Sequence, residues 1–197
     1  MASFLQPLVT VSEPIYLGEI VKYYKITQDD KYKTLIDGDS AKSLQQFAIQ
    51  LAYGKADMKG DETFKVKYNE DDHKKKPLSD IYTFFRPILI ASEKAAEALQ
   101  CTKQQQLKLE LPQEGLVGLF VTPLLENHLD KEKSKYDQGP NGYVVYKMVL
   151  KNVSTIEHDI FRILESPQTI IVSEQLKERI LKRNLKGFTL VEIPCTE

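Results

Sequence analysis

The residue types that most often carry chemistry are few in this chain, and their spacing matches no metal-binding motif. The three histidines, His73, His128 and His158, lie too far apart to have the spacing of a metal-ligand pair. Asp71, Asp72 and His73 are consecutive and could hold a cation, but a solvated charged loop explains them better. The sequence therefore predicts no metal site.

The sequence also contains no motif typical of a catalytic nucleophile or of a phosphate-binding loop. Neither Cys101 nor Cys195 has a histidine in its local sequence, so both are expected to be structural or inert. The segment GLVG at 115–118 lacks the lysine and the spacing of a phosphate-binding loop. Glu126 and Asp130 are spaced i, i+4, which a solvated helix face explains better than an acid–base pair. We expect no catalytic or cofactor-binding residue, although catalytic side chains dispersed along the chain would escape this search.

Composition and charge narrow the classes of partner. The chain has 197 residues, 42% of them hydrophobic and 28% charged, which is typical of a single soluble domain. Its net charge of −1 predicts no bulk attraction to nucleic acid or to an anionic membrane. The first residues, MASFLQPLVTVSEP, do not resemble a secretory signal, and no apolar stretch approaches the roughly 20 residues of a spanning helix. We expect a cytoplasmic protein with both cysteines reduced and no bridge between them.

Residues 1–78 form a variable amino-terminal part. Residues 15–26 are rich in β-branched and aromatic types and predict one or two strands, in which only one ring of the Tyr23–Tyr24 pair faces the core. The spacing of apolar residues predicts a helix over 40–53, capped by Asp39 or Ser40. The alternating segment TFKVKY at 63–68 is typical of an edge strand protected by its lysines.

The most organised feature is a pattern that occurs twice, at 79–112 and at 158–194. Each stretch opens with Asp-Ile-aromatic and has a proline near its middle. An apolar run then ends in Ser-Glu, and a helical segment, an alternating strand and a final proline follow. The corresponding residues are Asp80, Ile81, Tyr82, Pro87, Ser92, Glu93 and Pro112 in the first stretch, and Asp159, Ile160, Phe161, Pro167, Ser173, Glu174 and Pro194 in the second.

Helix-capping chemistry explains the Ser-Glu pairs. A serine at this position accepts a hydrogen bond from an amide of the first helical turn, and a glutamate favours the positive end of the helix dipole. Helices are therefore expected to begin at Ser92 and Ser173, each after a short strand. Leu176, Ile180 and Leu181 are expected to form the buried face of the second helix.

These elements predict an α+β fold. We expect a mixed, mainly antiparallel sheet with a few helices and two similar strand–helix–strand units. The single domain 1–197 would then consist of the amino-terminal part, the unit at 79–112, central strands and a loop at 113–158, and the unit at 159–194.

The segment from Asp-Ile-Phe-Arg through Val-Ser-Glu to Leu-x-Gly-Phe resembles a family of bacterial immunity proteins encoded beside polymorphic toxins, including type VI and contact-dependent effectors. The segment VTPLLENHLDKEKS at 121–134, with Leu129, Asp130 and Ser134, is similar to that family as well. The resemblance covers about residues 79–194. It implies a cytosolic protein that binds and neutralises a cognate toxin, and it carries over no catalytic residue.

Two polar segments are the predicted recognition loops, 69–76 and 128–141, because loops on a rigid scaffold commonly carry binding residues. A tyrosine among charged residues, as at position 136, often anchors an interface. Two other functions stay open, a small cytosolic enzyme with dispersed catalytic residues and a scaffold protein of an unrelated complex. The predicted partner-binding residues are Glu70, Asp71, Asp72, His128, Asp130, Tyr136 and Asp137.

Overall fold

The computed structural model describes residues 21–58, 62–100, 105–140 and 142–196. Within these ranges the fold is α+β, with three α-helices and sheets whose pairings are mostly antiparallel. The coarse fold class predicted from the sequence is therefore confirmed. No helix in the described part of the chain is long and apolar enough to cross a membrane.

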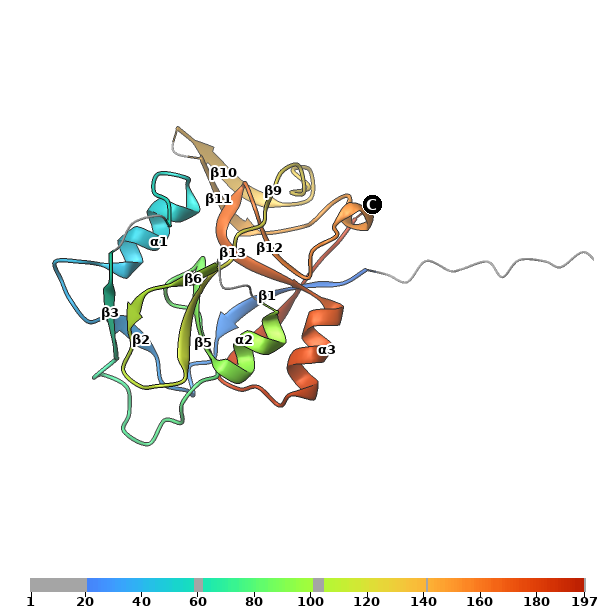
Figure 1. Cartoon of the computed structure of the whole chain (residues 1–197). Helices are drawn as coiled ribbons and strands as arrows, with labels where there is room; N and C mark the ends of the chain where they lie inside the picture. Colours follow the sequence, from blue (N-terminus) through green and yellow to red (C-terminus); the bar gives the residue numbers. More distant parts are fainter. Residues whose placement is uncertain (1–20, 59–61, 101–104, 141, 197) are drawn as a thin grey trace, which may run out of the picture.

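The largest sheet has five strands in the order β14-β1-β13-β12-β9 (Figure 1). Its pairings are antiparallel except that of β9 with β12, which is parallel. The strands are β1 (Tyr23–Gln28), β9 (Leu124–Leu125), β12 (Ile160–Ile163), β13 (Ser166–Ser173) and β14 (Phe188–Ile193).

The other strands form three smaller sheets. An antiparallel four-stranded sheet has the order β4-β5-β8-β6, a three-stranded sheet has the order β2-β3-β7, and β10 pairs with β11 as a separate hairpin. Their strands are β2 (Leu35–Asp37), β3 (Phe64–Tyr68), β4 (Ile81–Tyr82), β5 (Ile88–Ser92), β6 (Gln106–Leu107), β7 (Leu109–Glu110), β8 (Leu116–Phe120), β10 (Lys135–Gly139) and β11 (Gly142–Lys147).

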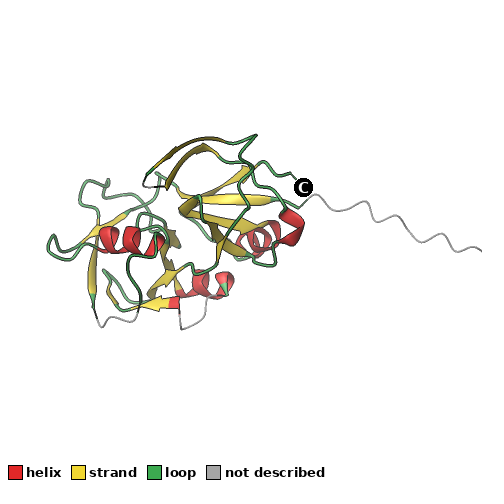
Figure 2. Ribbon diagram, turned by 90° about the horizontal axis from the view of Figure 1, so that it is seen from above, coloured by secondary structure: helices red, strands yellow, loops and turns green. Residues whose placement is uncertain are grey.

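Two helices, α2 (Glu93–Leu99) and α3 (Glu174–Lys182), pack against each other, whereas α1 (Leu44–Ala52) lies apart from them at one end of the molecule (Figures 1 and 2). As predicted, α2 begins after Ser92, whose hydroxyl accepts a hydrogen bond from Ala95 N at 3.2 Å. Likewise α3 begins after Ser173, whose hydroxyl accepts from Leu176 N at 3.1 Å. Each helix follows a strand directly, β5 or β13, so this prediction is confirmed.

The apolar interior consists of three clusters of buried residues. One lies between α2, α3 and the sheets and includes Tyr24, Leu176 and Ile180. A second packs α1 against β3 and β5. The third includes Tyr23 and Phe161 and lies on the other face of the five-stranded sheet. Because clusters cover both faces of that sheet, Tyr23 and Tyr24 are 2% and 4% exposed, and the prediction of one exposed ring is wrong.

Several predicted elements differ in extent. Helix α1 is shorter than the predicted 40–53, because Ser43 is its cap and accepts from Gln46 N at 3.1 Å. The strand predicted over 15–26 begins at Tyr23 in the described part, and residues 15–20 lie outside the described residues. The alternating segment at 106–110 is two short strands, because β6 pairs with β8 whereas β7 pairs with β3.

Three local predictions are wrong for reasons of tertiary packing. Strand β3 is the middle strand of its sheet, with β2 on one side and β7 on the other, so it is not an edge strand. Leu181 is 62% exposed, because the buried stripe of α3 is narrow and contains Leu176 and Ile180. Glu126 and Asp130 do not share a helix face, because residues 121–134 contain no helix.

Candidate functional site

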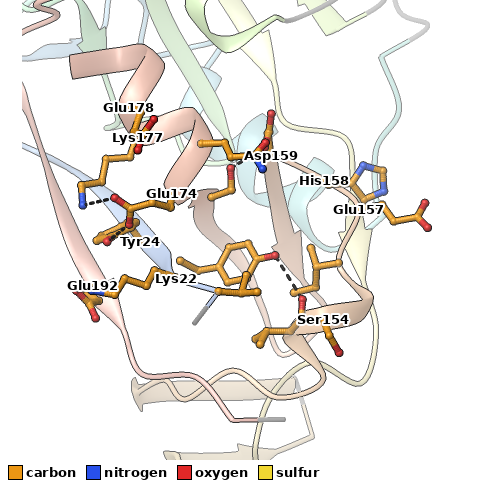
Figure 3. A pocket seen from close by; sticks show the side chains of 16 residues that line it. Lys22, Tyr24, Ser154, Glu157, His158, Asp159, Glu174, Lys177, Glu178 and Glu192 are labelled. Carbon is orange, nitrogen blue, oxygen red and sulfur yellow. Dashed lines mark hydrogen bonds and ion pairs between the residues drawn. The ribbon is translucent and has the colours of Figure 1, made fainter. Parts of the chain in front are cut away.

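A hollow in the described part of the molecule has a volume of about 910 Å³. It lies between the start of β1, the first turns of α3 and the segment from the 3-10 turn Val153–Thr155 to Asp159 (Figure 3). We call it the α3 groove. Its charged lining residues are Lys22, Glu157, Asp159, Glu174, Lys177, Glu178 and Glu192, and His158 lines it as well.

A tyrosine, a glutamate and a lysine meet in the α3 groove. The Tyr24 hydroxyl donates to Glu174 Oε2, and Lys177 Nζ lies 2.9 Å from Glu174 Oε1 and 4.0 Å from the centroid of the Tyr24 ring (Figure 3). Burial, and then the hydrogen bond to Glu174, raise the pKa of Tyr24. Hydrogen bonds from Tyr24 and Lys177 lower the pKa of Glu174. Tyr24 is therefore a protonated donor and Glu174 a charged acceptor at neutral pH.

A second polar group joins the start of α3 to β12. Ser173 Oγ donates to Asp159 Oδ1 at 2.6 Å, while Arg179 Nη2 donates to Asp159 Oδ2 at 2.7 Å. Burial raises the pKa of Asp159, but the hydrogen bonds from Ser173 and Arg179 outweigh burial and lower this pKa overall. Asp159 is therefore a charged acceptor that fixes the first turns of α3 in place.

The polar groups of the α3 groove are largely engaged with one another. Lys22 Nζ lies 3.9 Å from Glu192 Oε2 at one end of the groove, whereas Glu157 and His158 lie at the other end (Figure 3). The side chains of Glu157 and His158 make no hydrogen bond or ion pair with other described residues. Among the described residues, no three His, Cys, Asp or Glu side chains are placed to hold a metal ion.

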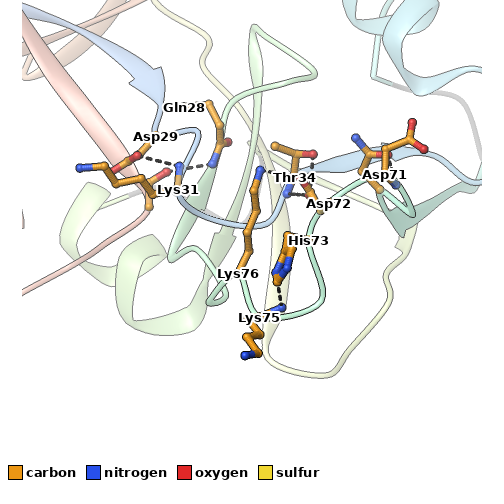
Figure 4. Close-up of polar contacts among 11 residues, drawn as sticks. Gln28, Asp29, Lys31, Thr34, Asp71, Asp72, His73, Lys75 and Lys76 are labelled. Atoms are coloured by element: carbon orange, nitrogen blue, oxygen red, sulfur yellow. Dashed lines mark hydrogen bonds and ion pairs between the residues drawn. The ribbon is translucent and has the colours of Figure 1, made fainter.

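The first predicted recognition loop is partly a structural element. Asp72 accepts hydrogen bonds from Thr34 N at 2.5 Å and from Lys76 Nζ at 2.8 Å, so its carboxylate ties two loops together (Figure 4). Its side chain is 7% exposed. Glu70 is exposed and pairs with Lys67, and Asp71 is exposed beside it. Only Glu70 and Asp71 therefore present carboxylates to solvent here.

The second predicted recognition loop begins with two residues that have local partners. His128 is half-buried, and its Nδ1 lies 3.1 Å from Lys151 O. Asp130 is 9% exposed and accepts from Glu132 N, Lys133 N and Thr196 Oγ1 at 3.0–3.1 Å. Burial raises the pKa of Asp130, but these hydrogen bonds outweigh it and lower the pKa. Asp130 thus joins a turn to the carboxy-terminal segment.

The remainder of that loop is the β10–β11 hairpin, not an irregular loop. Tyr136 is half-buried on the inner face of the hairpin, where its ring lies 5.6 Å from that of Tyr143. Asp137 is exposed on the outer face and accepts from the Tyr146 hydroxyl at 2.6 Å. A polar sequence can form a hairpin here because most of its side chains point to solvent.

The structure does not bring the two predicted recognition loops together. The loop at 69–76 follows β3 at one end of the molecule, whereas the β10–β11 hairpin protrudes at the opposite end (Figure 1).

Sequence reasoning missed two exposed apolar residues on the hairpin. Val144 and Tyr146 are 56% and 68% exposed and lie on its outer face with Asp137, which pairs with Val144. The signal was present in the segment YVVYK, because alternate residues of a strand point to opposite faces. The residues that form the α3 groove were also missed, and their wide separation along the chain gave no signal.

Neither a protein-family model nor a curated protein matches this chain.

Proposed function

We propose that this protein is an immunity protein that acts in the cytoplasm and neutralises a cognate bacterial toxin by forming a stoichiometric complex with it. The observation that carries the proposal is the outer face of the β10–β11 hairpin. This face presents Val144 and Tyr146 to solvent, and Asp137 accepts a hydrogen bond from the Tyr146 hydroxyl. Exposed aromatic side chains next to charged groups are typical anchors of protein interfaces.

The hairpin is well placed to act as a recognition element. Its inner face is fixed to the body of the protein, because Tyr136 and Val145 pack against the cluster that contains Phe161. Its outer face can therefore meet a partner without losing much conformational entropy. The resemblance of residues 79–194 to polymorphic-toxin immunity proteins supports the same proposal. Asp137 stays in the proposed binding surface, to which Val144 and Tyr146 are added, whereas Tyr136 lies on the inner face and anchors the hairpin.

The proposed scaffold consists of two similar strand–helix–strand units. Support comes from strand order, since β4-β5-β8-β6 corresponds to β12-β13-β1-β14 with antiparallel neighbours throughout. Further support comes from the caps, because Ser92 Oγ donates to Asp80 Oδ1 at 3.0 Å just as Ser173 Oγ donates to Asp159 Oδ1 at 2.6 Å. The third strand of the two sets comes from different places in the chain, β8 after α2 and β1 before α3.

Co-expression tests the proposed function. The chain would be produced together with the toxin encoded by the neighbouring reading frame, and growth and co-purification would be measured. We expect restored growth and a complex with equal amounts of both chains. Restored growth with a large excess of toxin over this protein, and without any complex, would identify a catalytic mode of protection and refute the proposal.

A further inference from the structure

The outer edge of β14 is open along residues 188–192, between the contact of Asp80 with Lys186 at one end and the contacts of Leu150 with Pro194 and Thr196 at the other. Within the described residues, β14 pairs with β1 on one side and has no strand on the other. Edge strands are normally short, bulged, or interrupted by lysine or proline, because an open row of backbone groups invites pairing with another chain. The six residues of β14, FTLVEI, contain no lysine or proline, and their pairing with β1 has no bulge.

The backbone groups available for pairing can be assigned. Asp29 N donates to Gly187 O at 3.1 Å, so this carbonyl points toward the β1 side. The N–H and C=O of one peptide unit point in opposite directions, so the N–H of Phe188 points outward. The alternation of an antiparallel strand then directs the backbone groups of Phe188, Leu190 and Glu192 away from β1.

The side chains along this edge are complementary to themselves. If a second copy pairs antiparallel with β14 about a two-fold axis at Thr189, Thr189 faces its own counterpart, and Phe188 of each copy faces Leu190 of the other. The same register places Lys186 of each copy opposite Glu192 of the other. Threonine pairs, aromatic–aliphatic pairs and opposite charges are the cross-strand pairs that stabilise a sheet.

The charged ends of this register are accessible. Lys186 is exposed, and the Glu192 side chain is 57% exposed, with only a 3.9 Å contact to Lys22. The backbone of Lys186 is already held by Asp80, which accepts from Lys186 N and donates its own N–H to Lys186 O, both at 2.8 Å. The backbone hydrogen bonds between the two copies would thus be made by Phe188 and Leu190. Lys186 of one copy would contact Glu192 of the other through its side chain alone.

We propose that β14 is a dimerisation edge, which pairs with β14 of a second copy of this chain in the register centred on Thr189. The two five-stranded sheets then form one continuous sheet of about ten strands. Charge complementarity favours a second copy as the partner and favours this register. In this register Lys186 of each copy lies opposite Glu192 of the other copy. This proposal does not depend on the toxin, because a dimer with two toxin sites still binds one toxin per chain.

A charge-swap experiment on the full chain tests the proposal. The dimer dissociation constant would be measured by sedimentation equilibrium for the natural chain, Glu192→Lys, Lys186→Glu, the double swap Lys186→Glu/Glu192→Lys, and the control Glu126→Lys. Glu126 is exposed beside β9, at the opposite edge of the same sheet. Each single reversal puts like charges opposite each other twice per dimer, so we expect dissociation constants about tenfold higher. The double swap should return to within about threefold of the natural value, and the control should not differ from it.

Hydrogen–deuterium exchange of the same samples identifies the surface. The amides of Phe188 and Leu190 should exchange fast in dilute protein and become protected as the dimer forms. A chain that stays monomeric at high concentration overturns the proposal. So does a dimer that is insensitive to both single reversals. Protection of these amides even in dilute protein would show that another segment of the same chain covers the edge, which also overturns it.

Discussion

At the scale of single residues, the structure depends on carboxylates that accept hydrogen bonds from helix caps and turns. Asp159, Asp130 and Asp72 each accept at least two hydrogen bonds while partly or largely withdrawn from water, and the pKa of each is lowered. Their location in two polar segments of the sequence led to the prediction that Asp72 and Asp130 bind a partner. Asp72 accepts a hydrogen bond from Thr34 and Asp130 accepts one from Thr196, and both donors are distant along the chain. The sequence alone could not therefore reveal that these two carboxylates hold separate segments together.

Ser173→Ala tests the cap of α3. Removing the hydroxyl leaves Leu176 N without its acceptor and Asp159 Oδ1 without its donor, although Arg179 still donates to Oδ2. We therefore expect a loss of about 1 to 2 kcal/mol in the free energy of unfolding, measured with urea. The control Ser154→Ala changes an exposed serine and should stay within about 0.5 kcal/mol of the natural protein. Equal effects of the two substitutions would contradict the capping role.

The lowered pKa of Asp159 predicts a dependence of stability on pH. A carboxyl whose folded-state pKa lies below its unfolded value stabilises the fold above the unfolded pKa, about 3.9, and loses this effect as pH falls through the folded pKa. Asp159→Asn should therefore be less stable than the natural chain at pH 7, and this difference should shrink as the pH falls below about 4. The exposed control Asp71→Asn should show a small difference at every pH. If Asp159→Asn is less stable than the natural chain by the same amount at every pH, the charge of Asp159 does not stabilise the fold.

At the scale of elements, the helix starts could be predicted from the local sequence, whereas the pairing of strands could not. The starts of α2 and α3 follow from Ser-Glu after an apolar run, which is local chemistry. The position of β3 inside its sheet depends on its pairing with β7, and the alternating segment that contains β7 gives no signal of which strand it pairs with. The burial of both Tyr23 and Tyr24 depends on clusters built from distant segments that cover both faces of one sheet.

Gly187 lies between α3 and β14 and packs against Ser79, which precedes β4. Its φ is +91°, and a Cβ at this position would overlap the side chain of Ser79. Gly187→Ala should therefore lower the unfolding free energy by about 3 to 4 kcal/mol, because backbone strain and steric overlap add. The control Gly115→Ala has φ of +75° but open space around its Cβ, so we expect about 1 to 2 kcal/mol. Thermal unfolding of both variants would measure these losses of stability. Equal losses for Gly187→Ala and Gly115→Ala would contradict the steric role of Ser79.

At the scale of the whole molecule, we propose that the outer face of the β10–β11 hairpin binds the toxin, whereas its inner face contributes to stability. Tyr146→Ala should change the unfolding free energy by less than about 0.5 kcal/mol, because the ring is 68% exposed. The same variant should bind the toxin about 2 kcal/mol more weakly by calorimetry. Tyr53→Ala, an exposed tyrosine after α1, is the control and should bind normally. Unchanged affinity of Tyr146→Ala would remove the hairpin from the proposed interface.

The central claim is that protection is stoichiometric, and a titration tests it most directly. Increasing amounts of the purified chain would be added to a fixed amount of the toxin encoded beside it, and the remaining toxin activity would be measured. We predict a linear fall that ends at one chain per toxin, because each complex removes one toxin molecule. Complete loss of toxin activity at a small fraction of one equivalent, or full activity at several equivalents, would contradict the claim.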